Sequence, residues 1–406
     1  MPDFKTVTNC RVCGSDRLKR YLDLGKVPPA NSLLQSEHSE SVKYPLEVLF
    51  CEECSLSQLS VVVPPEILYG SYPYNSSVSE TFKKHCYEMA KFLKGMTTSH
   101  KPSVVDIASN DGCLLEQFKK CNYYVNGVEP CLDLAEKSNA KGIATVNDFW
   151  NERASSLTPA CDIITATNVL AHVDDVKSFI GLAKKNLRVA SKGFMVVEVP
   201  YLSNILKSNQ FDTIYHEHLS YFLFKPLKIL FESCGMKVFR VEQHDIHGGS
   251  LRVYASPYER DVHQSVEMIE NFESFNKLHE FQTYIGFAQK VTEAGSRFKD
   301  LLKDLALEGK KVMGYGASAK GASLMNYCDI TQHEVESILD DTKEKQGKFI
   351  PGCRIPIVDK SHLEKSFPDY LVLFSWNFAW ELISNTKTHK ERGGKYIIPI
   401  PQVCIL

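Results

Sequence analysis

The spacing of apolar and polar positions changes several times along the chain, and these changes divide it into four segments. Residues 1–78 contain too few apolar positions for a large independent core. Between 79 and 260, stretches with helical periodicity, such as 79–95, alternate with short apolar runs typical of buried strands. The clearest of these runs are 103–107, 123–129, 162–166 and 193–199. This alternation predicts a Rossmann-like domain, a mostly parallel sheet with helices on its faces.

The remaining sequence follows two further patterns. Between 261 and 308 it is charged, and apolar residues such as Leu278, Phe281 and Ile285 recur at helical intervals, which predicts one long linking helix. Strand-like runs then return at 311–316, 335–339, 370–374 and 395–398. The predicted fold class is therefore α/β, with a small N-terminal domain, a central Rossmann-like domain and a second Rossmann-like domain over 309–406.

Length and charge limit the possible partners. A chain of 406 residues usually forms two or three domains. Its net charge of -2 gives no general attraction to nucleic acid or to an anionic membrane. The N-terminus lacks the pattern of an export signal, and no apolar run approaches the length of a membrane span. We expect a cytoplasmic protein, a monomer or weak dimer, that acts on a small molecule.

Four of the thirteen cysteines form two C-x-x-C pairs, Cys10 with Cys13 and Cys51 with Cys54. Each such turn presents two sulfurs to one ion, so the pairs predict a tetrahedral structural zinc site. Four thiolates leave no open coordination position for a substrate. The alternatives are metal-free buried thiols, which the polar neighbouring residues disfavour, and a nucleic-acid-binding zinc ribbon, which the absence of a dense basic patch disfavours.

The loop after the strand-like run at 103–107 has the form of a nucleotide-binding turn. An acidic residue ends the strand, small residues follow, and a helix begins, so backbone N–H groups face a ligand. The candidate residues are Asp106, Ala108, Asn110 and Gly112, with Ala108 standing where many such loops have glycine. These features predict a site for S-adenosylmethionine.

Residues beyond this loop extend the predicted cofactor site. Glu129, followed by Pro130, ends the next strand, where a carboxylate accepts hydrogen bonds from ribose hydroxyls. Asp148 is placed to meet the adenine amine, and the alternative is an ordinary helix N-cap. Asn168, in a run that ends at His172, is expected near the methionine part of the cofactor.

Tyr215, His216, Glu217 and His218 place a phenol, two imidazoles and a carboxylate in consecutive positions. Histidine has the ordinary pKa closest to that required for removing a proton next to a carbonyl. A carboxylate can orient an imidazole, and a phenol can donate to an enolate oxygen. In an extended or turn conformation the two histidines share one face, whereas in a helix the four side chains diverge. The tetrad is a candidate catalytic centre, with a buried structural role as the alternative.

Together these motifs resemble those of the zinc-containing, S-adenosylmethionine-dependent sugar C-methyltransferases, which build branched deoxysugars on nucleotide carriers. The resemblance covers nearly the whole chain and keeps the family's order of motifs. Besides the cysteine pairs and the cofactor loop, the matching segments are 72–77, 168–172, 197–201, 215–221, 247–252 and 314–321. Two positions depart from the pattern, Ala108 and Asn75, the latter often being aromatic.

The resemblance implies a reaction and the residues for it. The expected substrate is a dTDP-, GDP- or CDP-linked 4-keto-deoxysugar that is methylated at the carbon beside the ketone. His218 is implied as the base that forms the enolate, with Tyr215 and Glu217 around the sugar. Tyr72 or Tyr74 is implied to enter the site from the zinc domain, or else to pack between domains. The further implied substrate contacts are Glu198, Tyr201, His216, Tyr221, His247, Gly248, Arg252, Tyr315 and Lys320.

Some alternatives stay open. Gly248 and Gly249 also fit a plain turn before a strand. The glycine-rich run 314–321 looks like a dinucleotide fingerprint, but the resemblance assigns it to the nucleotide-sugar, with Lys320 near the diphosphate, so no NAD is predicted. Two other functions are compatible with the motifs, namely O- or N-methylation of a related sugar and a non-catalytic zinc-ribbon interaction protein.

Overall fold

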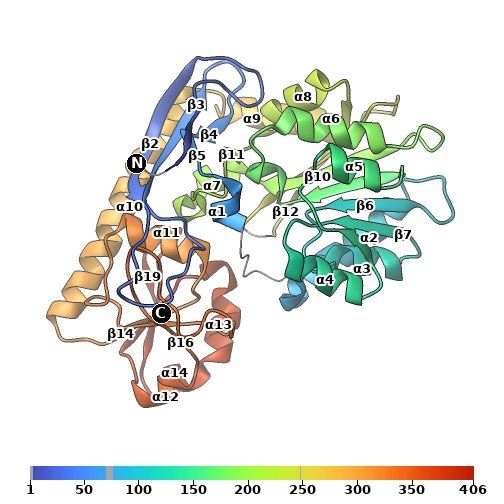
Figure 1. Cartoon of the computed structure of the whole chain (residues 1–406). Coiled ribbons are helices and arrows are strands. Elements are labelled where there is room, and N and C mark those ends of the chain that lie inside the picture. The colour runs from blue at the N-terminus through green and yellow to red at the C-terminus, as the bar shows by residue number, and fades with distance from the viewer. Residues whose placement is uncertain (1–2, 70–75, 247) are drawn as a thin grey trace.

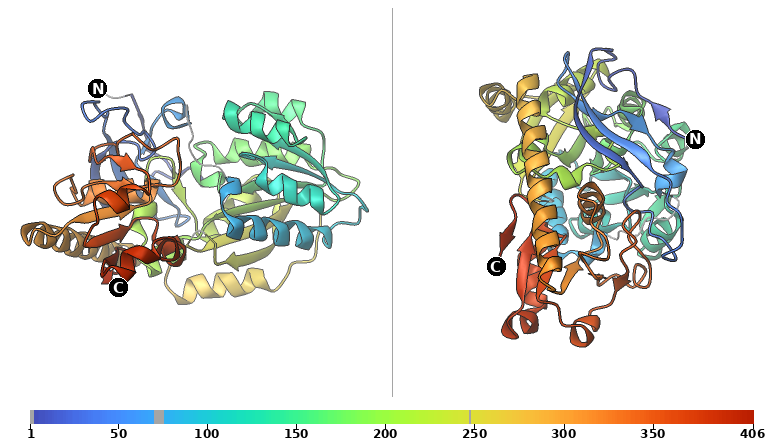
Figure 2. Two further views of the ribbon diagram at one scale, coloured as in Figure 1. Left: turned by 90° about the horizontal axis from the view of Figure 1, so that it is seen from below. Right: turned by 90° about the vertical axis from the view of Figure 1, so that its left-hand side faces the viewer.

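The structure is a computed structural model that describes residues 3–69, 76–246 and 248–406. It has three lobes, which we call the N-terminal, middle and C-terminal lobes (Figure 1). The N-terminal and C-terminal lobes lie on one side of the molecule and the middle lobe lies on the other. Figure 2 shows this division from two further directions. The sequence-based domain boundaries stay predictions.

The N-terminal lobe is built on a four-stranded antiparallel sheet in the order β11-β4-β3-β2. Its edge strand β11 (Ser220–Tyr221) comes from the middle of the chain and pairs with β4 (Ser57–Leu59). Along β3 (Tyr44–Cys51) the buried side chains alternate with less buried ones, as a sheet with one covered face requires. The other elements of this lobe are β1 (Lys5–Thr6), β2 (Leu18–Val27), β5 (Val61–Val62) and α1 (Pro65–Tyr69).

The middle lobe contains a seven-stranded sheet in the order β12-β13-β10-β9-β6-β7-β8. The five strands from β10 to β8 are parallel, and β13 and β12 add antiparallel strands at one edge. These strands are β6 (Ser103–Ile107), β7 (Tyr124–Val128), β8 (Ala144–Val146), β9 (Ile163–Thr167), β10 (Phe194–Pro200), β12 (Lys237–His244) and β13 (Ser250–Ser256). The four strands expected from the apolar runs are therefore present, each within one residue at either end.

Helices cover both faces of this sheet (Figure 1). The first long one, α2 (Glu80–Lys94), begins at Ser79, whose hydroxyl accepts from the backbone N–H of Phe82. The other helices and 3-10 turns of this part are η1 (Ser76–Val78), α3 (Cys113–Lys120), α4 (Leu132–Ala140), α5 (Glu152–Leu157), η2 (Leu170–His172), α6 (Val176–Asn186), α7 (Leu202–Lys207), η3 (Phe211–Thr213) and α8 (Phe224–Ser233).

The segment predicted as one linking helix forms two, α9 (Ser265–Phe275) and α10 (Phe281–Leu307). The prediction of a single helix was wrong because Lys277 takes a left-handed backbone conformation (φ 56°), which ends α9. Helix α9 packs on α8 and β12 of the middle lobe. Helix α10 instead lies along β2 and β14, and so joins the two lobes on the other side (Figure 2).

The C-terminal lobe contains a six-stranded sheet in the order β16-β15-β14-β17-β18-β19. All neighbours are parallel except β19 (Cys404–Ile405). The other strands are β14 (Val312–Tyr315), β15 (Ile338–Leu339), β16 (Ile357–Val358), β17 (Tyr370–Leu373) and β18 (Lys395–Ile398). The helices are α11 (Ala319–Tyr327), α12 (His362–Lys365), η4 (Trp376–Phe378), α13 (Ala379–Asn385) and α14 (Lys387–Glu391). The predicted α/β class, with two Rossmann-like sheets, is confirmed.

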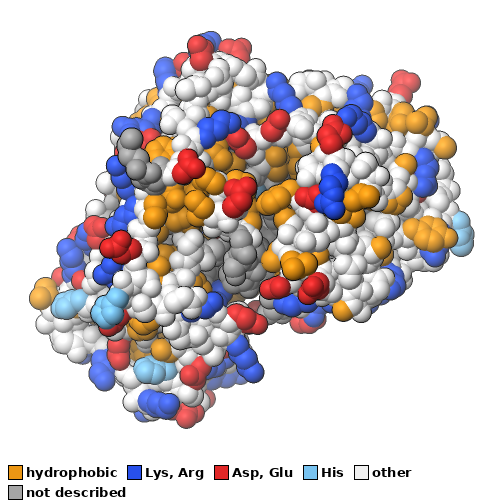
Figure 3. Space-filling view, viewed as in Figure 1, with side chains coloured by type: hydrophobic (Ala, Val, Ile, Leu, Met, Phe, Trp, Pro, Cys, Tyr) orange, Lys and Arg blue, Asp and Glu red, His pale blue; other side chains and the backbone are white. Residues whose placement is uncertain are grey.

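One apolar core runs through the three lobes and includes Phe50, Val197 and Val372. On the face shown in Figure 3 the surface is hollowed between the lobes, and hydrophobic side chains gather beside this hollow. Along the described residues, no helix combines the length and the apolar character that crossing a bilayer requires.

Candidate active site

A cavity of about 580 Å³ lies where the three lobes meet. The N-terminal lobe lines it with Asn31, Leu68 and Tyr69, and the C-terminal lobe with the 318–320 turn and Lys345. Its remaining wall comes from the middle lobe, at the carboxyl ends of the parallel strands, where α/β sheets usually bind ligands. A cavity of this size holds a cofactor and a small substrate together.

The predicted cofactor loop follows β6 and lines this cavity. Ala108, Asn110 and Gly112 have left-handed backbone conformations (φ 58°, 53° and 79°), which curl the chain so that α3 starts beside the cavity. Asp106 accepts a hydrogen bond from Thr165 Oγ1 at 2.7 Å, and burial raises the pKa of its carboxyl to about 7. Ala108 adopts this conformation at a steric cost that glycine would avoid, because glycine has no Cβ.

Glu129 holds the same loop from the neighbouring strand. One of its carboxylate oxygens accepts from the backbone N–H of Asn110 at 2.8 Å, and the other accepts from that of Cys131 at 2.9 Å. Burial raises the pKa of Glu129, and these two donors oppose that effect. Pro130 also lines the cavity.

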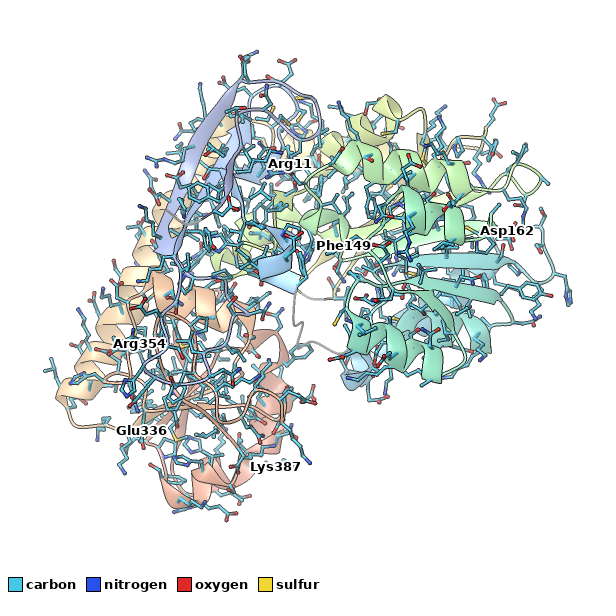
Figure 4. All side chains as sticks on the ribbon, viewed as in Figure 1. Arg11, Phe149, Asp162, Glu336, Arg354 and Lys387 are labelled. Carbon is cyan, nitrogen blue, oxygen red and sulfur yellow. The ribbon has the colours of Figure 1, made fainter. Side chains whose placement is uncertain are left out.

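Asp148 lies on the cavity wall and is not a helix N-cap. The cap of α5 is Asn151, whose side chain accepts from Ala154 N and donates to Asp148 Oδ1 at 3.0 Å. The neighbouring Phe149, labelled in Figure 4, is 45% exposed and lines the same cavity. A carboxylate beside an exposed aromatic ring fits an adenine, which offers an amine and a flat face.

Asn168 and His172 complete this wall. Asn168 has a left-handed backbone conformation (φ 55°), and its N–H donates to the carbonyl oxygen of Glu198 at 2.8 Å. The hydroxyl of Tyr69 lies 3.0 Å from Nδ1 of His172, and burial lowers the pKa of His172 to about 4. The structure therefore brings the predicted cofactor residues together around one cavity, except for Gly112, which caps α3 and does not line the cavity. The donors and acceptors of the lining residues fit S-adenosylmethionine.

The tetrad forms a turn in which Tyr215 and His218 share the face toward the cavity. The Tyr215 hydroxyl lies 2.9 Å from His218 Nε2, and the two rings are 4.1 Å apart. His218 Nδ1 lies 2.8 Å from the carbonyl oxygen of Thr213. Because a carbonyl only accepts, Nδ1 carries the proton, and the lone pair of Nε2 accepts the hydrogen bond from the Tyr215 hydroxyl. Burial and the nearby His172 hold the pKa of His218 well below 6.5, so the ring is neutral.

The other two members of the tetrad point elsewhere, so the two histidines do not share a face. His216 Nε2 donates to the carbonyl oxygen of Pro45 at 3.1 Å, and burial lowers the pKa of His216 to about 4. Glu217 is 1% exposed, and its Oε1 accepts from Asn31 Nδ2 at 3.0 Å. Burial raises the pKa of Glu217 to about 7. Its Oε2 has no hydrogen-bond partner within the described part of the chain.

The C-terminal lobe closes the cavity with the turn that precedes α11. Ser318 caps this helix by accepting from Gly321 N at 3.1 Å. The Lys320 ammonium is buried, lies 5.0 Å from the centre of the Trp376 ring and has no hydrogen-bond partner in the segments that the structure describes. Burial lowers the pKa of Lys320, and the charge of Asp212 opposes that effect. A buried, unpaired ammonium at a cavity wall is a receptor for an anion.

Several residues implied as substrate contacts do not line the cavity. Glu198 binds Arg252 at 2.7 Å inside the sheet, and Tyr201 donates to Glu273 at 3.0 Å. Tyr315 donates to Asp341 at 2.6 Å. Tyr221 lies in β11, and the Gly248 carbonyl accepts from Gln210 at 3.0 Å. Substrate contact by these residues stays a prediction. Tyr72, Tyr74 and His247 lie outside the described residues.

Two residues of the N-terminal lobe were missed by the sequence reasoning, Asn31 and Tyr69. Both line the cavity, and they contact Glu217 and His172, which are more than one hundred positions away in the chain. Asn31 lies in the stretch between the two C-x-x-C pairs, directly after the 27–30 run of apolar residues, and nothing in the local sequence signals this contact.

The four predicted zinc ligands come together in the N-terminal lobe. Their sulfur atoms all lie within 4.8 Å of one another. Two short distances join one C-x-x-C pair to the other. The Sγ atoms of Cys10 and Cys54 are 3.4 Å apart, and those of Cys13 and Cys51 are 3.5 Å apart. A tetrahedral zinc with four thiolates spaces its sulfurs by about 3.8 Å. The donor set and its size therefore fit a closed structural zinc site.

Three family models match successive parts of the chain: a zinc binding domain over residues 10–69, a methyltransferase domain over 81–241 and a C-methyltransferase C-terminal domain over 245–401. The C-methyltransferase NovU of Streptomyces niveus is 34% identical over 407 residues, covering 98% of this chain and 96% of NovU.

Solved structures are similar to part of this chain only at low TM-score and low identity. Magnesium protoporphyrin IX methyltransferase from Synechocystis PCC 6803 with bound SAM has a TM-score of 0.34 and 10% identity, covering 43% of this chain and 79% of that one. The PH0226 protein from Pyrococcus horikoshii OT3 has a TM-score of 0.37 and 12% identity, covering 47% of this chain and 98% of that one.

The fold and the site define a zinc-containing methyltransferase that uses S-adenosylmethionine. The full-length relationship to NovU identifies the family: the chain belongs to the C-methyltransferases.

The zinc site leads to a first prediction. Replacing Cys51 with Ser should abolish stoichiometric zinc binding and lower the melting temperature, because the ion no longer holds the two C-x-x-C turns together. Metal analysis and thermal unfolding would measure both effects. The matched control is Cys404→Ser at an exposed thiol outside the site. A Cys51 variant that binds no zinc and melts like the wild type would contradict a structural role for the metal.

A second prediction concerns Glu198. Its burial favours the neutral acid, but the hydrogen bond with His85 and the charge of Arg252 lower the pKa of Glu198 to about 2. Glu198→Gln should lower the free energy of unfolding at pH 7 by about 3–5 kcal/mol, because Arg252 stays buried without its counter-charge.

The pH dependence follows from the lowered pKa. The stabilisation by ionised Glu198 is complete above the ordinary glutamate pKa and is lost as the pH falls toward 2. The free energies of unfolding of the wild type and of Glu198→Gln should therefore become similar in acid. Urea unfolding at pH 7 and near pH 3 would measure the difference. The control is Glu152→Gln in an exposed ion pair, with an expected change below about 1 kcal/mol. A constant difference at both pH values would contradict this account.

Proposed function

We propose that this C-methyltransferase acts on a nucleotide-linked 4-keto-deoxysugar and methylates the carbon beside the ketone. The observation that carries the proposal is the pair of Tyr215 and His218 on the wall of the cofactor cavity. Carbon has no lone pair for a methyl group, so C-methylation requires a base that first removes a proton, which O- or N-methylation does not.

His218 is arranged for that step. Its Nδ1–H donates to the Thr213 carbonyl, which fixes the ring and directs Nε2 toward Tyr215. Because burial keeps the imidazole neutral, Nε2 is unprotonated at neutral pH, and it can take up a proton once the Tyr215 hydroxyl turns from it toward the substrate oxygen. A ketone acidifies its neighbouring C–H bonds, so a weak base is sufficient when the enolate oxygen is stabilised. The Tyr215 hydroxyl is the group placed to move a proton or to donate to that oxygen.

The enclosed site protects the enolate that this step forms. S-adenosylmethionine, when bound, supplies an electrophilic methyl group. The cavity walls come from all three lobes, and apolar side chains such as Val63, Leu68 and Val173 form part of them. Excluding water matters because an enolate in water takes up a proton again before it is methylated.

The C-terminal lobe supports the nucleotide-sugar part of the proposal. The ammonium of Lys320 is buried without a hydrogen-bond partner among the described groups, beside the N-terminus of α11. A ketosugar has no charge of its own, whereas its nucleotide carrier has a diphosphate that pairs with an ammonium and with helix N–H groups. Lys320 is therefore proposed to bind the diphosphate.

The substrate assignment is tested with methyl-labelled S-adenosylmethionine and a panel of dTDP-, GDP- and CDP-linked 4-ketosugars. We expect label in at least one sugar, with NMR showing a new methyl group on carbon. The matched controls are the same sugars reduced to 4-hydroxyls, which lack the acidic C–H and should stay unlabelled. Label that appears only as a methoxy or N-methyl group, or no label in any ketosugar, would overturn the proposal.

A third prediction tests the base. His218→Asn should reduce methyl transfer by at least about 100-fold, because no general base remains. It should also abolish deuterium exchange from solvent at the carbon beside the ketone, whereas calorimetry should show normal cofactor binding. The control is His333→Asn at an exposed histidine. Exchange at the wild-type rate in the His218 variant would mean that another group removes the proton.

A further inference from the structure

Arg11 lies between two zinc ligands, Cys10 and Cys13, on the side of the N-terminal lobe that faces the middle lobe (Figure 4). Although it belongs to a short surface turn, its side chain is only 3% exposed. Its backbone N–H donates to Gln58 Oε1 at 3.0 Å, and Gln58 in turn donates to the Asn9 carbonyl at 3.1 Å. The position of the guanidinium is therefore fixed by the same turn that presents the thiolates.

The guanidinium reaches two chain segments outside the zinc site. Its Nε donates to Asp174 Oδ1 at 3.0 Å, in a salt bridge between two lobes. Its Nη1 lies 3.1 Å from the carbonyl oxygen of Leu219 and 3.4 Å from that of Leu59. The planar guanidinium of arginine has several N–H donors in fixed directions and can therefore reach these acceptors at the same time, whereas the single ammonium of a lysine cannot.

Both segments belong to the active site. Leu219 directly follows His218, and Asp174 is two residues beyond His172. The rings of these two histidines meet edge to face at 5.0 Å, and both line the cavity. One buried side chain therefore holds the ends of both histidine-bearing segments.

We propose that Arg11 is a positioning residue for methyl transfer: it transmits the geometry of the zinc turn to His172 and His218 without touching either substrate. This role rests on the proposed function of His218. It gives the zinc site a catalytic consequence, because the ion fixes the turn from which Arg11 extends.

The test compares Arg11→Met and Arg11→Lys with the wild type, all as full-length, zinc-loaded protein. Arg11→Met should lower kcat by about ten-fold or more, because small displacements of catalytic groups strongly reduce rates. KM for S-adenosylmethionine should stay within about three-fold, since no binding contact is removed. Arg11→Lys should restore part of kcat. The control is Lys5→Met, which removes the exposed partner of the other Asp174 oxygen and should leave kcat unchanged.

Asp174→Asn provides a second route if Arg11→Met loses zinc or fails to fold. It leaves the zinc turn and the contact of Arg11 with the Leu219 carbonyl intact, so it should lower kcat less than Arg11→Met does. It should add little in the double variant, because Arg11→Met already removes the same salt bridge. A kcat within about two-fold of wild type in Asp174→Asn, or in a folded, zinc-loaded Arg11→Met, would overturn the positioning role.

A readout without substrate separates this proposal from the proposed function. Hydrogen exchange measured by mass spectrometry should be faster over 168–176 and 214–221 in Arg11→Met, and unchanged in Lys5→Met. If the wild type methylates no ketosugar but both segments loosen, the substrate assignment fails and the coupling through Arg11 stands. Unchanged exchange in both segments would overturn the role of Arg11 whatever the substrate is.

Discussion

The pairing of β11 with β4 is the constraint on which the site depends. β11 is only two residues long, yet it adds a segment from the middle of the chain to the sheet of the N-terminal lobe. Because only Leu219 separates His218 from Ser220 and Tyr221, this pairing fixes one end of the turn that contains Tyr215 and His218. The other end begins near η3, where Asp212 accepts from Trp376 of the C-terminal lobe at 2.6 Å. The turn from 212 to 221 is thus attached to both other lobes.

That attachment explains why the polar groups of the turn are buried at all. A buried imidazole or carboxyl is costly unless its hydrogen bonds are made, and a charged one is costlier still. The structure meets most of this constraint with partners from the N-terminal and middle lobes: Pro45 for His216, Asn31 for Glu217, and Thr213 and Tyr215 for His218. Oε2 of Glu217 has no such partner within the described residues. The desolvation of the turn also keeps both histidines neutral. The burial of the turn and the neutral state of its histidines therefore have one physical cause.

The sequence was sufficient to predict those features that depend on residues close together in the chain. Apolar runs located the strands of the middle lobe, and the spacing of the C-x-x-C pairs identified the ligands that the structure brings together. The cofactor loop was also recognisable, since its strand, turn and helix are consecutive. The break at Lys277 was missed because a left-handed residue of this type leaves no periodic signal.

Contacts between segments that are far apart in the chain could not be predicted from the sequence. Asn31 meets Glu217 across 186 positions, and Arg11 meets Leu219 across 208. Glu198 and Arg252 look like candidate ligand contacts in a sequence, but adjacent strands bring them together as a buried pair. A polar residue in an apolar strand has two explanations, a ligand or an internal partner. Only the three-dimensional register of the strands distinguishes them.

The arrangement also gives a physical reason for a zinc lobe in a methyltransferase. A base and a methyl donor must be held within a narrow range of positions, and a turn of buried polar residues is not rigid by itself. In the proposed reaction, disordered packing there would admit water and allow the enolate to take up a proton. A four-thiolate ion holds together the two C-x-x-C turns of a small lobe. The lobe contributes β4, Asn31 and Arg11 to the contacts of the 212–221 turn. Stability supplied by the metal therefore fixes the geometry of a segment that lies far away in the chain.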